Sequence, residues 1–224
     1  MLIEYFIRGG WVMWPILGAS IVALAVVLNR LFFFMRARGD PAELAREILR
    51  LVDERQISEA KAKCAESSVP AAAVLEAGLS AWGLAQEEFE RRMEHAAAEQ
   101  LGAAEARLPM LASMVAVLPM LGFLGTILGL IEAFGAWAAA GANVSIEQLA
   151  KGIEEAMITT AGGLLTSIPY VLAYNAFSAA VGRMARSVNA AASELAGRHR
   201  VRETTEAASA APASVTVLSV GGGR

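Results

Sequence analysis

Three long stretches of the chain are apolar and carry no charged residue. They cover residues 9–29, 108–131 and 156–182, and a charged residue lies at each of their ends. A helix needs about 20 apolar residues to cross the hydrocarbon core of a bilayer, which is about 30 Å thick. The pattern therefore predicts an all-α integral membrane protein with three transmembrane helices.

The first apolar stretch begins close to the N-terminus, so a cleaved signal peptide is the alternative to a retained helix. The apolar region of a signal peptide is about 7–15 residues long and follows a basic segment. Residues 9–29 form a longer stretch, and the segment before it carries one base, Arg8, and one acid, Glu4. These features favour a retained transmembrane helix.

Basic residues are distributed unevenly between the segments that flank the apolar stretches. Of the 19 Lys and Arg residues, only Arg8 and Lys151 lie outside residues 30–107 and 183–224. Cytoplasmic segments of membrane proteins carry the excess of basic residues, most strongly next to the helix ends. The distribution predicts an N-terminus outside the cytoplasm and a C-terminus inside it.

The segment between the first two apolar stretches has the pattern of several helices. Asp40 followed by Pro41 is typical of an N-cap with proline at the first helical position. Ser58 can cap a second short helix, which Pro70 would end. Residues 71–107 contain no further proline, so we expect a long helix there that runs directly into the second transmembrane helix.

The third transmembrane helix has a start signal and an extension. Ser145 and Gln148 have the spacing of a capping box, so this helix should begin near Ile146 and extend to at least Arg183. The residues from Glu203 onward are rich in Ala, Ser, Thr and Gly, and such a segment cannot bury a core. We therefore expect a disordered tail.

Composition excludes several classes of function. Hydrophobic residues make up 56% of the chain and charged residues only 18%, against about half and about a quarter in soluble domains. The net charge of -3 argues against nucleic acid as a partner, because a basic surface would be required. One cysteine, Cys64, and two histidines, His95 and His199, make neither a disulfide framework nor a zinc site. We expect no metal and no cofactor.

The apolar stretches also lack the residues of an intramembrane protease. Such an enzyme needs a Ser/His pair or two aspartates within the membrane. Both histidines lie outside the three stretches, and no stretch contains an aspartate. No nucleotide-binding loop or nucleophile elbow occurs elsewhere. The sequence therefore predicts a protein that is not an enzyme.

Small and hydroxyl side chains follow two adjacent faces of the third transmembrane helix. Residues four, three and four positions apart share one helical face. One such set is Glu155, Thr159, Gly162 and Thr166, and the other is Ala156, Thr160, Gly163 and Ser167. The second transmembrane helix contains Gly122, Gly125, Thr126 and Gly129, of which Gly125 and Gly129 have the spacing of a small-residue contact motif.

Two interpretations of these faces remain open. Small residues let helix backbones approach closely, and hydroxyls bond across the contact or back to their own helix. Alternatively, polar residues at membrane depth line a pore or an ion path. Glu155 is either part of such a path or a solvated acid at the outer mouth, with Lys151 as its partner one turn earlier.

Three segments resemble signatures of the MotA/TolQ/ExbB proton-channel family. Residues 119–134 (PMLGFLGTILGLIEAF) resemble its second-helix signature, and residues 152–175 (GIEEAMITTAGGLLTSIPYVLAYN) resemble its third-helix signature. Residues 9–30 are similar to the beginning of its first helix. Three helices, an outside N-terminus and a large cytoplasmic segment are similar to the ExbB/TolQ branch, whereas the flagellar-stator branch has four transmembrane helices.

This resemblance implies a subunit of an inner-membrane proton-driven motor. Subunits of this branch form a homo-oligomeric ring, a pentamer, around the single transmembrane helices of ExbD/TolR-like partners, whose membrane aspartate takes up and releases protons. The ring couples the proton-motive force to energised outer-membrane transport or envelope work through a TonB/TolA-like periplasm-spanning protein. A non-conducting membrane scaffold or assembly protein is the alternative.

The resemblance also implies roles for individual residues. Thr126 falls on the threonine of the second-helix signature, Glu155 on the glutamate of the third, and Thr160 on the threonine five residues later. Thr159 is a further hydroxyl on the helical face of Glu155, so either Thr159 or Thr160 would face the partner's aspartate. These four residues are the expected proton pathway. The residues expected to line the pore or pack the helices are Gly122, Gly125, Gly129, Gly162, Gly163, Thr166 and Ser167.

Together, these inferences divide the chain into eight segments. They are a periplasmic N-terminus (1–8), transmembrane helix 1 (9–35), a cytoplasmic helical domain (36–107), transmembrane helix 2 (108–137), a periplasmic loop (138–147), transmembrane helix 3 (148–183), a cytoplasmic extension of that helix (184–202) and a disordered tail (203–224).

Overall fold

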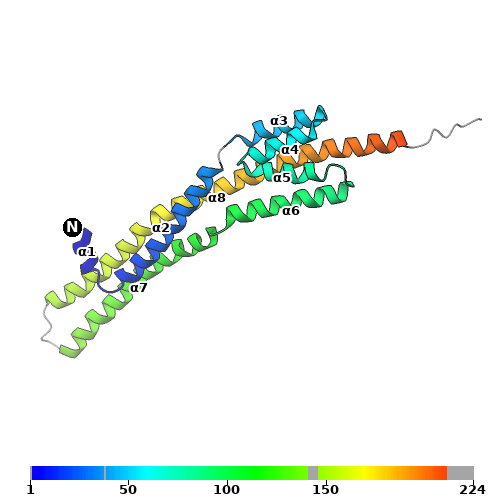
Figure 1. The fold of residues 1–224 in the computed structure, drawn as a ribbon. Coiled ribbons are helices and arrows are strands. Elements are labelled where there is room, and N and C mark those ends of the chain that lie inside the picture. The colour runs from blue at the N-terminus through cyan, green and yellow to red at the C-terminus, as the bar shows by residue number, and fades with distance from the viewer. Residues whose placement is uncertain (1, 38, 141–145, 211–224) are drawn as a thin grey trace, which may run out of the picture. The chain divides into compact units, whose positions relative to one another are not determined.

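The described part of the chain is built from α-helices. The computed structural model describes the backbone of residues 2–37, 39–140 and 146–210, and these residues form helices without any β-strand (Figure 1). The predicted all-α fold is confirmed. In chain order the helices are α1 (Leu2–Arg8), α2 (Met13–Arg36), α3 (Pro41–Asp53), α4 (Ile57–Glu66), α5 (Pro70–Ser80), α6 (Gln86–Glu105), α7 (Leu108–Ala140) and α8 (Ile146–Ala210).

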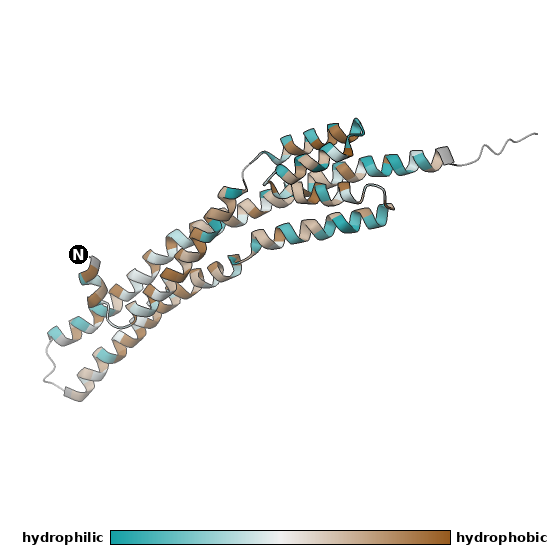
Figure 2. Cartoon of the chain, viewed as in Figure 1, coloured by the Kyte–Doolittle hydropathy of each residue, from teal (hydrophilic) through white to brown (hydrophobic). Residues whose placement is uncertain are grey.

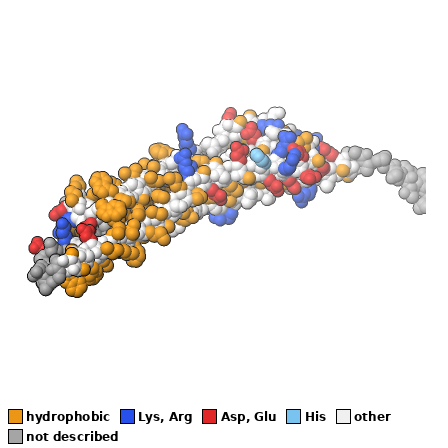
Figure 3. Space-filling model, turned by 90° about the horizontal axis from the view of Figure 1, so that it is seen from below, with side chains coloured by type: hydrophobic (Ala, Val, Ile, Leu, Met, Phe, Trp, Pro, Cys, Tyr) orange, Lys and Arg blue, Asp and Glu red, His pale blue; other side chains and the backbone are white. Residues whose placement is uncertain are grey.

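The chain divides into two compact units. The first, which we call the membrane unit, comprises Met1–Arg38 and Leu101–Ala185, and the second, the polar unit, comprises Gly39–Gln100 and Arg186–Arg224. Hydrophobic side chains cover most of the visible surface of the membrane unit (Figure 3), whereas charged side chains are frequent on the polar unit. The hydropathy of the helices changes in the same way (Figure 2).

Within the described residues, three helices are long and apolar enough to cross a membrane. They are α2, α7 and α8, the helices that contain the three apolar stretches. Large apolar side chains on them point away from the protein, among them Ile21, Ile131 and Leu165. A surface of this kind is stable in lipid but not in water. The three predicted transmembrane helices are therefore confirmed by length and composition.

Packing within the membrane unit joins α2 to both α7 and α8. Its buried core includes Ile16, Leu111 and Val181, one from each of the three helices. The Tyr170 hydroxyl of α8 lies 2.9 Å from both the Oγ and the carbonyl oxygen of Ser20 in α2. These contacts hold α2 against both α7 and α8, the two helices that form the site described below.

Residues 71–107 include the long helix α6, but α6 and α7 are separate, so the prediction that this helix runs directly into the second transmembrane helix is wrong. α6 ends at Glu105, Arg107 has a φ of 68°, and α7 begins at Leu108. Pro109 explains the break, because in a continuous helix its ring would clash with the Glu105 carbonyl and leave it without a donor. The chain is also interrupted between α5 and α6, at residues 81–85.

The start of α3 follows the prediction, but that of α4 does not. The Asp40 carboxylate accepts a hydrogen bond of 2.9 Å from the Ala42 amide, as an N-cap does. Arg55 has a φ of 61°, and the next amide, of Gln56, donates to the Leu51 carbonyl, which ends α3 in a Schellman turn. The chain therefore enters α4 at once at Ile57, and Ser58 lies inside the first turn instead of capping it. Pro70 begins α5.

Helix α8 begins at Ile146, as predicted, and continues to Ala210. The first part of the segment predicted to be a disordered tail, from Glu203 to Ala210, is thus helical. An ion pair between Arg202 and Glu206, one turn apart at 3.1 Å, supports this end of the helix. Residues 211–224, and Ser145 of the predicted capping box, lie outside the described residues.

Candidate functional site

Glycines of α7 pack directly against small residues of α8. A Cβ atom at Gly125 would overlap the Thr159 side chain, and one at Gly163 would lie only 2.7 Å from the Leu118 carbonyl oxygen. Only glycine permits such close backbone approach. We call this contact the seam, and its residues are Gly122, Gly125 and Gly129 of α7 with Gly152, Ala156, Thr159 and Gly163 of α8.

The two helices run in opposite directions along the seam. Gly122 meets Gly163, Gly125 meets Thr159, and Gly129 meets Ala156 and Gly152. As the residue number rises in α7, it falls in α8. The packing interpretation of the small residues therefore holds for these glycines within a single chain.

The five Ser and Thr hydroxyl groups of the predicted site all donate to backbone carbonyls. Four of them bond within their own helix, which satisfies a hydroxyl without any neighbour. These bonds are Thr126 to Phe123 at 2.6 Å, Thr159 to Ala156 at 2.8 Å, Thr166 to Gly162 at 2.6 Å and Ser167 to Leu164 at 2.8 Å. Thr160 differs, because its Oγ1 donates across the seam to the Gly122 carbonyl oxygen at 3.0 Å.

Thr159 and Thr160, the two candidates of the predicted proton pathway, occupy different environments. Thr159 is only 1% exposed, because its side chain fills the space above Gly125. Thr160 is partly exposed, beside the seam instead of within it. In a single chain, Thr160 is therefore the more accessible of the two to another molecule.

Thr126 and Thr160 lie on the same side of the seam. Thr126 follows the seam residue Gly122 by four positions, and Thr160 follows Ala156 by four. Four residues turn the side-chain direction by about 40° beyond one full turn of an α-helix. Because the two helices are antiparallel, equal rotations about their own axes carry both threonines toward the same side.

Glu155 lies on the other side of the seam, against the residues that lead into α2. Its carboxylate lies over Gly10, whose φ of 65° and missing side chain make the space for it. Seven residues, about two turns, further along α8, a Cβ atom at Gly162 would lie 3.1 Å from Cε of Met13 in α2. The structure thus separates Glu155 and Gly162 from the two threonines.

The ion pair of Glu155 with Lys151, part of one of the two interpretations of Glu155, is absent from the part of the chain that the structure describes. Instead, the neighbouring Glu154 pairs with Arg8 of α1 at 2.8 Å. Both partners are about half exposed, so this pair contributes at most about 1 kcal/mol to stability.

Exposed apolar side chains surround the two threonines. We call this surface the threonine face, and it comprises Thr126 and Thr160 with the exposed Phe123, Ile127, Met157 and Leu164. Met157 is 67% exposed and Phe123 64%. No Lys, Arg or His occurs in α7, or in α8 from Ala156 to Gly182. The face therefore offers two hydroxyls and no fixed positive charge within a wide apolar surface.

Sequence reasoning missed Gly10 and Met13 as parts of this arrangement. The paired glycines directly before the first apolar stretch were a usable signal, because a glycine pair often marks a backbone conformation with positive φ. The contact of Met13 with Gly162 has no such signal, because any long apolar residue at that position could fill the gap.

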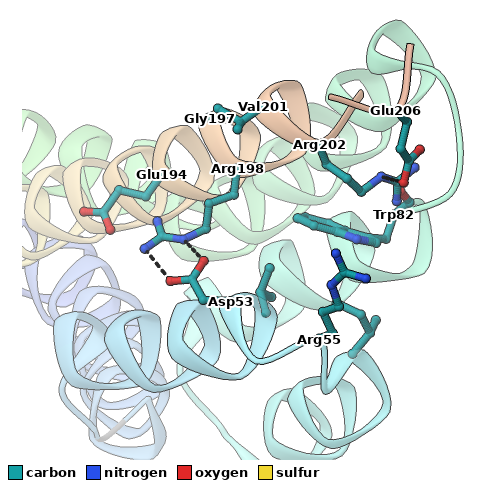
Figure 4. A pocket seen from close by; sticks show the side chains of 11 residues that line it. Asp53, Arg55, Trp82, Glu194, Gly197, Arg198, Val201, Arg202 and Glu206 are labelled. Atoms are coloured by element: carbon teal, nitrogen blue, oxygen red, sulfur yellow. Dashed lines mark hydrogen bonds and ion pairs between the residues drawn. The ribbon is translucent and has the colours of Figure 1, made fainter. Parts of the chain in front are cut away.

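A second candidate site lies in the polar unit, in a pocket of about 740 Å³ (Figure 4). Arg198 donates two hydrogen bonds to the Asp53 carboxylate, at 2.8 and 3.2 Å, and the Arg202 guanidinium lies over the Trp82 ring. The described residues contain no cluster of three His, Cys, Asp or Glu side chains suited to a metal ion. Since Asp53 is paired with an arginine, these contacts are better explained as packing between α3 and α8 than as a reactive centre.

Comparison with known proteins connects the site to a family. Residues 66–190 match the MotA/TolQ/ExbB proton channel family. An ExbB-like biopolymer transport protein of Synechocystis sp. is 33% identical over 180 residues, which are 77% of this chain and 69% of that protein. The biopolymer transport protein exbB1 of Vibrio cholerae is 30% identical over 72% of each chain.

A TolQ protein, from the same ExbB/TolQ branch, is similar over a shorter region. The Tol-Pal system protein TolQ of Haemophilus influenzae is 40% identical over 88 residues, which are 39% of this chain and 38% of that protein. The family match covers more than half of the chain and includes every seam residue of α7 and α8. The chain is therefore a multi-pass membrane protein that belongs to the MotA/TolQ/ExbB proton channel family, in its ExbB/TolQ branch.

Proposed function

We propose that the chain is a subunit of a proton-driven motor in the bacterial inner membrane. Copies of it form a pentameric ring around the transmembrane helices of an ExbD/TolR-like partner, with the N-terminus in the periplasm and the C-terminus in the cytoplasm. The motor couples the proton-motive force to energised outer-membrane transport or envelope work through a TonB/TolA-like protein. Family membership and the excess of basic residues in 30–107 and after residue 182 support this proposal.

The observation that carries the proposal is the position of Thr126 and Thr160 on one open side of the seam. The other side is contacted by Gly10, which precedes α2, and by Met13, the first residue of α2. In a ring with α2 toward the lipid, the threonine face would turn inward, toward the partner's helix. A polar pair within an apolar face is typical of a surface that contacts a protein group at membrane depth.

The hydrogen bonds of the two threonines indicate which form of the partner's aspartate they favour. A hydroxyl has one donor and two acceptor lone pairs. The Thr160 hydroxyl donates its hydrogen to the Gly122 carbonyl, and the Thr126 hydroxyl donates its hydrogen to the Phe123 carbonyl. Each hydroxyl therefore presents acceptors, which bind a protonated carboxylic acid or a water molecule but not a carboxylate. We infer that this face stabilises the neutral, proton-carrying state of the aspartate.

Glu155 has a different role in the proposal. Arg8 compensates Glu154, so Glu155 is left as a negative charge near the start of α8. A fixed negative charge at a mouth raises the local concentration of cations, protons included. Glu155 would thus act at the periplasmic end of the route, without direct contact with the two threonines.

A non-conducting scaffold remains the alternative, and the close packing of the seam is the observation that favours it. Gly122, Gly125, Gly129 and Gly163 are all used in contacts within one chain. A scaffold needs this packing, to which the Thr160 hydroxyl contributes its bond to Gly122, but it needs no contact between a hydroxyl and a partner's aspartate. The two functions therefore differ in what they require of Thr160.

The experiment is a comparison of Thr160→Val with Thr166→Val in cells that depend on the motor. Valine keeps the shape of threonine and removes its hydroxyl. We expect Thr160→Val to lower the rate of proton-driven transport or growth by about twofold to tenfold, as for a lost hydrogen bond to a neutral group worth about 0.5–1.5 kcal/mol. Thr166→Val, which removes a hydroxyl bonded within its own helix, should leave the rate nearly unchanged.

The same experiment separates Thr159 from Thr160. Thr159→Val should retain activity, because the buried side chain fills space against Gly125 and valine fills it equally. Glu155→Gln should weaken the activity without dissociating the complex. Complex assembly, measured as the mass of the solubilised complex with and without the partner, is the control for every variant. If Thr160→Val assembled and worked at the wild-type rate, the scaffold alternative would be supported instead.

A further inference from the structure

Three arginines line one pocket of the membrane unit, at the end of α2. They are Arg30 and Arg36 of α2 and Arg107, which lies between α6 and α7. The pocket has a volume of about 690 Å³, and Phe32 and Phe33 also line it. No carboxylate is among the described residues that line it, and none of the three arginines forms an ion pair within the part of the chain that the structure describes.

Arg30 is the centre of this cluster and is only 6% exposed. Its Nη1 donates to the Ala103 carbonyl oxygen at 2.9 Å, and its Nη2 donates to Oδ1 of Asn29 at 3.0 Å. The guanidinium also lies over the Phe33 ring, 4.9 Å from its centroid. All of these partners are neutral. A buried charge without a counterion is costly, so the site is electrostatically incomplete.

A buried donor of Arg30 also lacks a partner. Its Nε has no hydrogen-bond acceptor in the structure, although the atom is buried. Leaving such a donor unsatisfied costs about 1–3 kcal/mol. A bound acceptor in the pocket would satisfy it and at the same time neutralise the cation.

The other two arginines approach the pocket from exposed positions. Arg36 lies in the last turn of α2, and Arg107 is held beside the pocket by the break before α7, where its φ is 68°. Three like charges that face one space repel one another, and an anion between them converts this repulsion into attraction. The arrangement therefore selects for a negatively charged ligand.

Phosphate is the anion that this geometry suits. The planar guanidinium donates two parallel hydrogen bonds, a spacing that matches the oxygens of phosphate. The pocket also has an apolar wall, because Phe32 of α2, which lines it, is 65% exposed. Basic pockets at the cytoplasmic ends of transmembrane helices bind anionic headgroups in this way. We propose that the pocket binds the phosphate of an anionic phospholipid, with Phe32 against its acyl chain.

Two sources can supply a phosphate group, the lipid headgroup and free phosphate. An acyl chain distinguishes them, because only a lipid uses the apolar wall. The headgroup distinguishes lipids from each other, because phosphatidylcholine carries a trimethylammonium group that the three arginines repel. Phosphatidylglycerol, phosphatidylcholine and inorganic phosphate are therefore the three probes of the test.

The experiment is native mass spectrometry of the full-length protein in detergent, titrated with each of the three probes. We expect tighter binding of phosphatidylglycerol than of phosphatidylcholine, and no displacement of phosphatidylglycerol by excess inorganic phosphate. Arg107→Gln and Arg36→Gln should each weaken phosphatidylglycerol binding by about fivefold. Arg183→Gln, an exposed arginine of the same unit that does not line the pocket, is the matched control and should bind like the wild type.

Arg30→Gln should weaken binding further, but the loss of a buried side chain can also unfold the chain. For this reason the proposal is tested by the substitutions of the exposed Arg107 and Arg36. Equal affinity for phosphatidylglycerol and phosphatidylcholine, or unchanged affinity in both of these variants, would overturn the proposal. Displacement by inorganic phosphate would show that free phosphate is the source and would equally reject the lipid.

Discussion

In the membrane unit, α7 and α8 meet through glycine, alanine and threonine, whereas in the polar unit α6 and α8 meet through Phe89 and His199. A Cβ atom at Gly163 would already clash with the backbone of α7. In the polar unit, by contrast, the fully buried Phe89 ring stacks on His199, 4.1 Å between centroids, and Trp82 packs edge-on against both rings. One contact depends on having no side chains, the other on having large ones.

The environment of each unit explains this difference. In lipid, burying a large apolar side chain between helices brings little gain, so helices associate through close backbone packing and hydrogen bonds. In water, burying an aromatic ring is strongly favourable. A membrane helix packed through small residues leaves its larger apolar residues on the surface, and in the membrane unit this leaves the threonine face open.

The polar unit should respond most strongly to the loss of an aromatic ring. Phe89→Ala should destabilise it by about 3–5 kcal/mol, as expected for a buried phenylalanine. Phe134→Ala removes the same ring from an exposed position of α7 and is the matched control. Denaturant unfolding in detergent, followed by the reactivity of Cys64 in the polar unit, measures the change. Equal effects of the two variants would contradict the assigned role of Phe89.

The membrane unit should be destabilised by the opposite kind of change, the addition of a methyl group. Gly163→Ala forces α7 and α8 apart and should cost about 1–3 kcal/mol. Gly135→Ala places the same methyl in open space on α7 and should be neutral or stabilising by about 0.5–1 kcal/mol, because alanine favours helix. Thermal unfolding of the detergent-solubilised protein gives both values. The account of the seam fails if the two substitutions have the same sign and size.

A smaller effect is expected from acid on the polar unit. Hydrogen bonds from Gln86 and Arg200 hold the pKa of the Glu90 carboxyl below its ordinary value of 4.5. A lowered pKa in the folded chain means that the stabilisation is present at neutral pH and is lost as the pH falls from 4.5 through the folded pKa. Glu90→Gln should make unfolding less sensitive to pH in this window. The exposed Glu87→Gln on the same helix should retain the wild-type dependence, as melting temperatures against pH would show.

The smallest expected signal is the labelling of the Cys64 thiol by a thiol reagent while the chain is folded. Burial, with a lesser contribution from the charge of Glu76, raises the pKa of the Cys64 thiol to about 12. At about pH 8 the thiolate is therefore scarce, and a thiol reagent should react only after the polar unit opens. Phe89→Ala should accelerate the labelling and Gly163→Ala should not. Rapid labelling of the native wild type would show that the thiol is accessible.

Much of the fold could be predicted from the sequence because its signals are local. Uncharged apolar stretches give the membrane helices, and Asp40 with Pro41 gives the start of α3. Two expectations failed, the cap of α4 at Ser58 and the helix that continues without a break into α7. Each failed at a position where a single residue changes the backbone direction. Arg55 has a positive φ where glycine is usual, and the break at Arg107 depends on a proline two residues later.

The site could be predicted only in part, because helical spacing gives faces but not neighbours. The spacing placed Thr159 with Glu155, and this relation is preserved in α8. Which face meets which helix depends on the packing of α2 and α7, which spacing within α8 does not contain. That packing buries Thr159 against Gly125 and brings Thr160 to the same side of the seam as Thr126. The arginine pocket was missed for a similar reason, since Arg30 and Arg107 are distant in sequence.

The most direct test of the central proposal is cysteine crosslinking between this chain and the transmembrane helix of its partner. Cys64→Ser provides the background, and Met157→Cys on the threonine face is compared with Leu165→Cys. Met157 and Leu165 are both strongly exposed in α8, but their positions eight residues apart lie about 80° from one another around the helix. Crosslinks from Met157→Cys to a cysteine near the partner's membrane aspartate, with none from Leu165→Cys, are the predicted result. Crosslinks from Leu165→Cys alone would show that the threonine face points away from the partner and would contradict the proposed proton route.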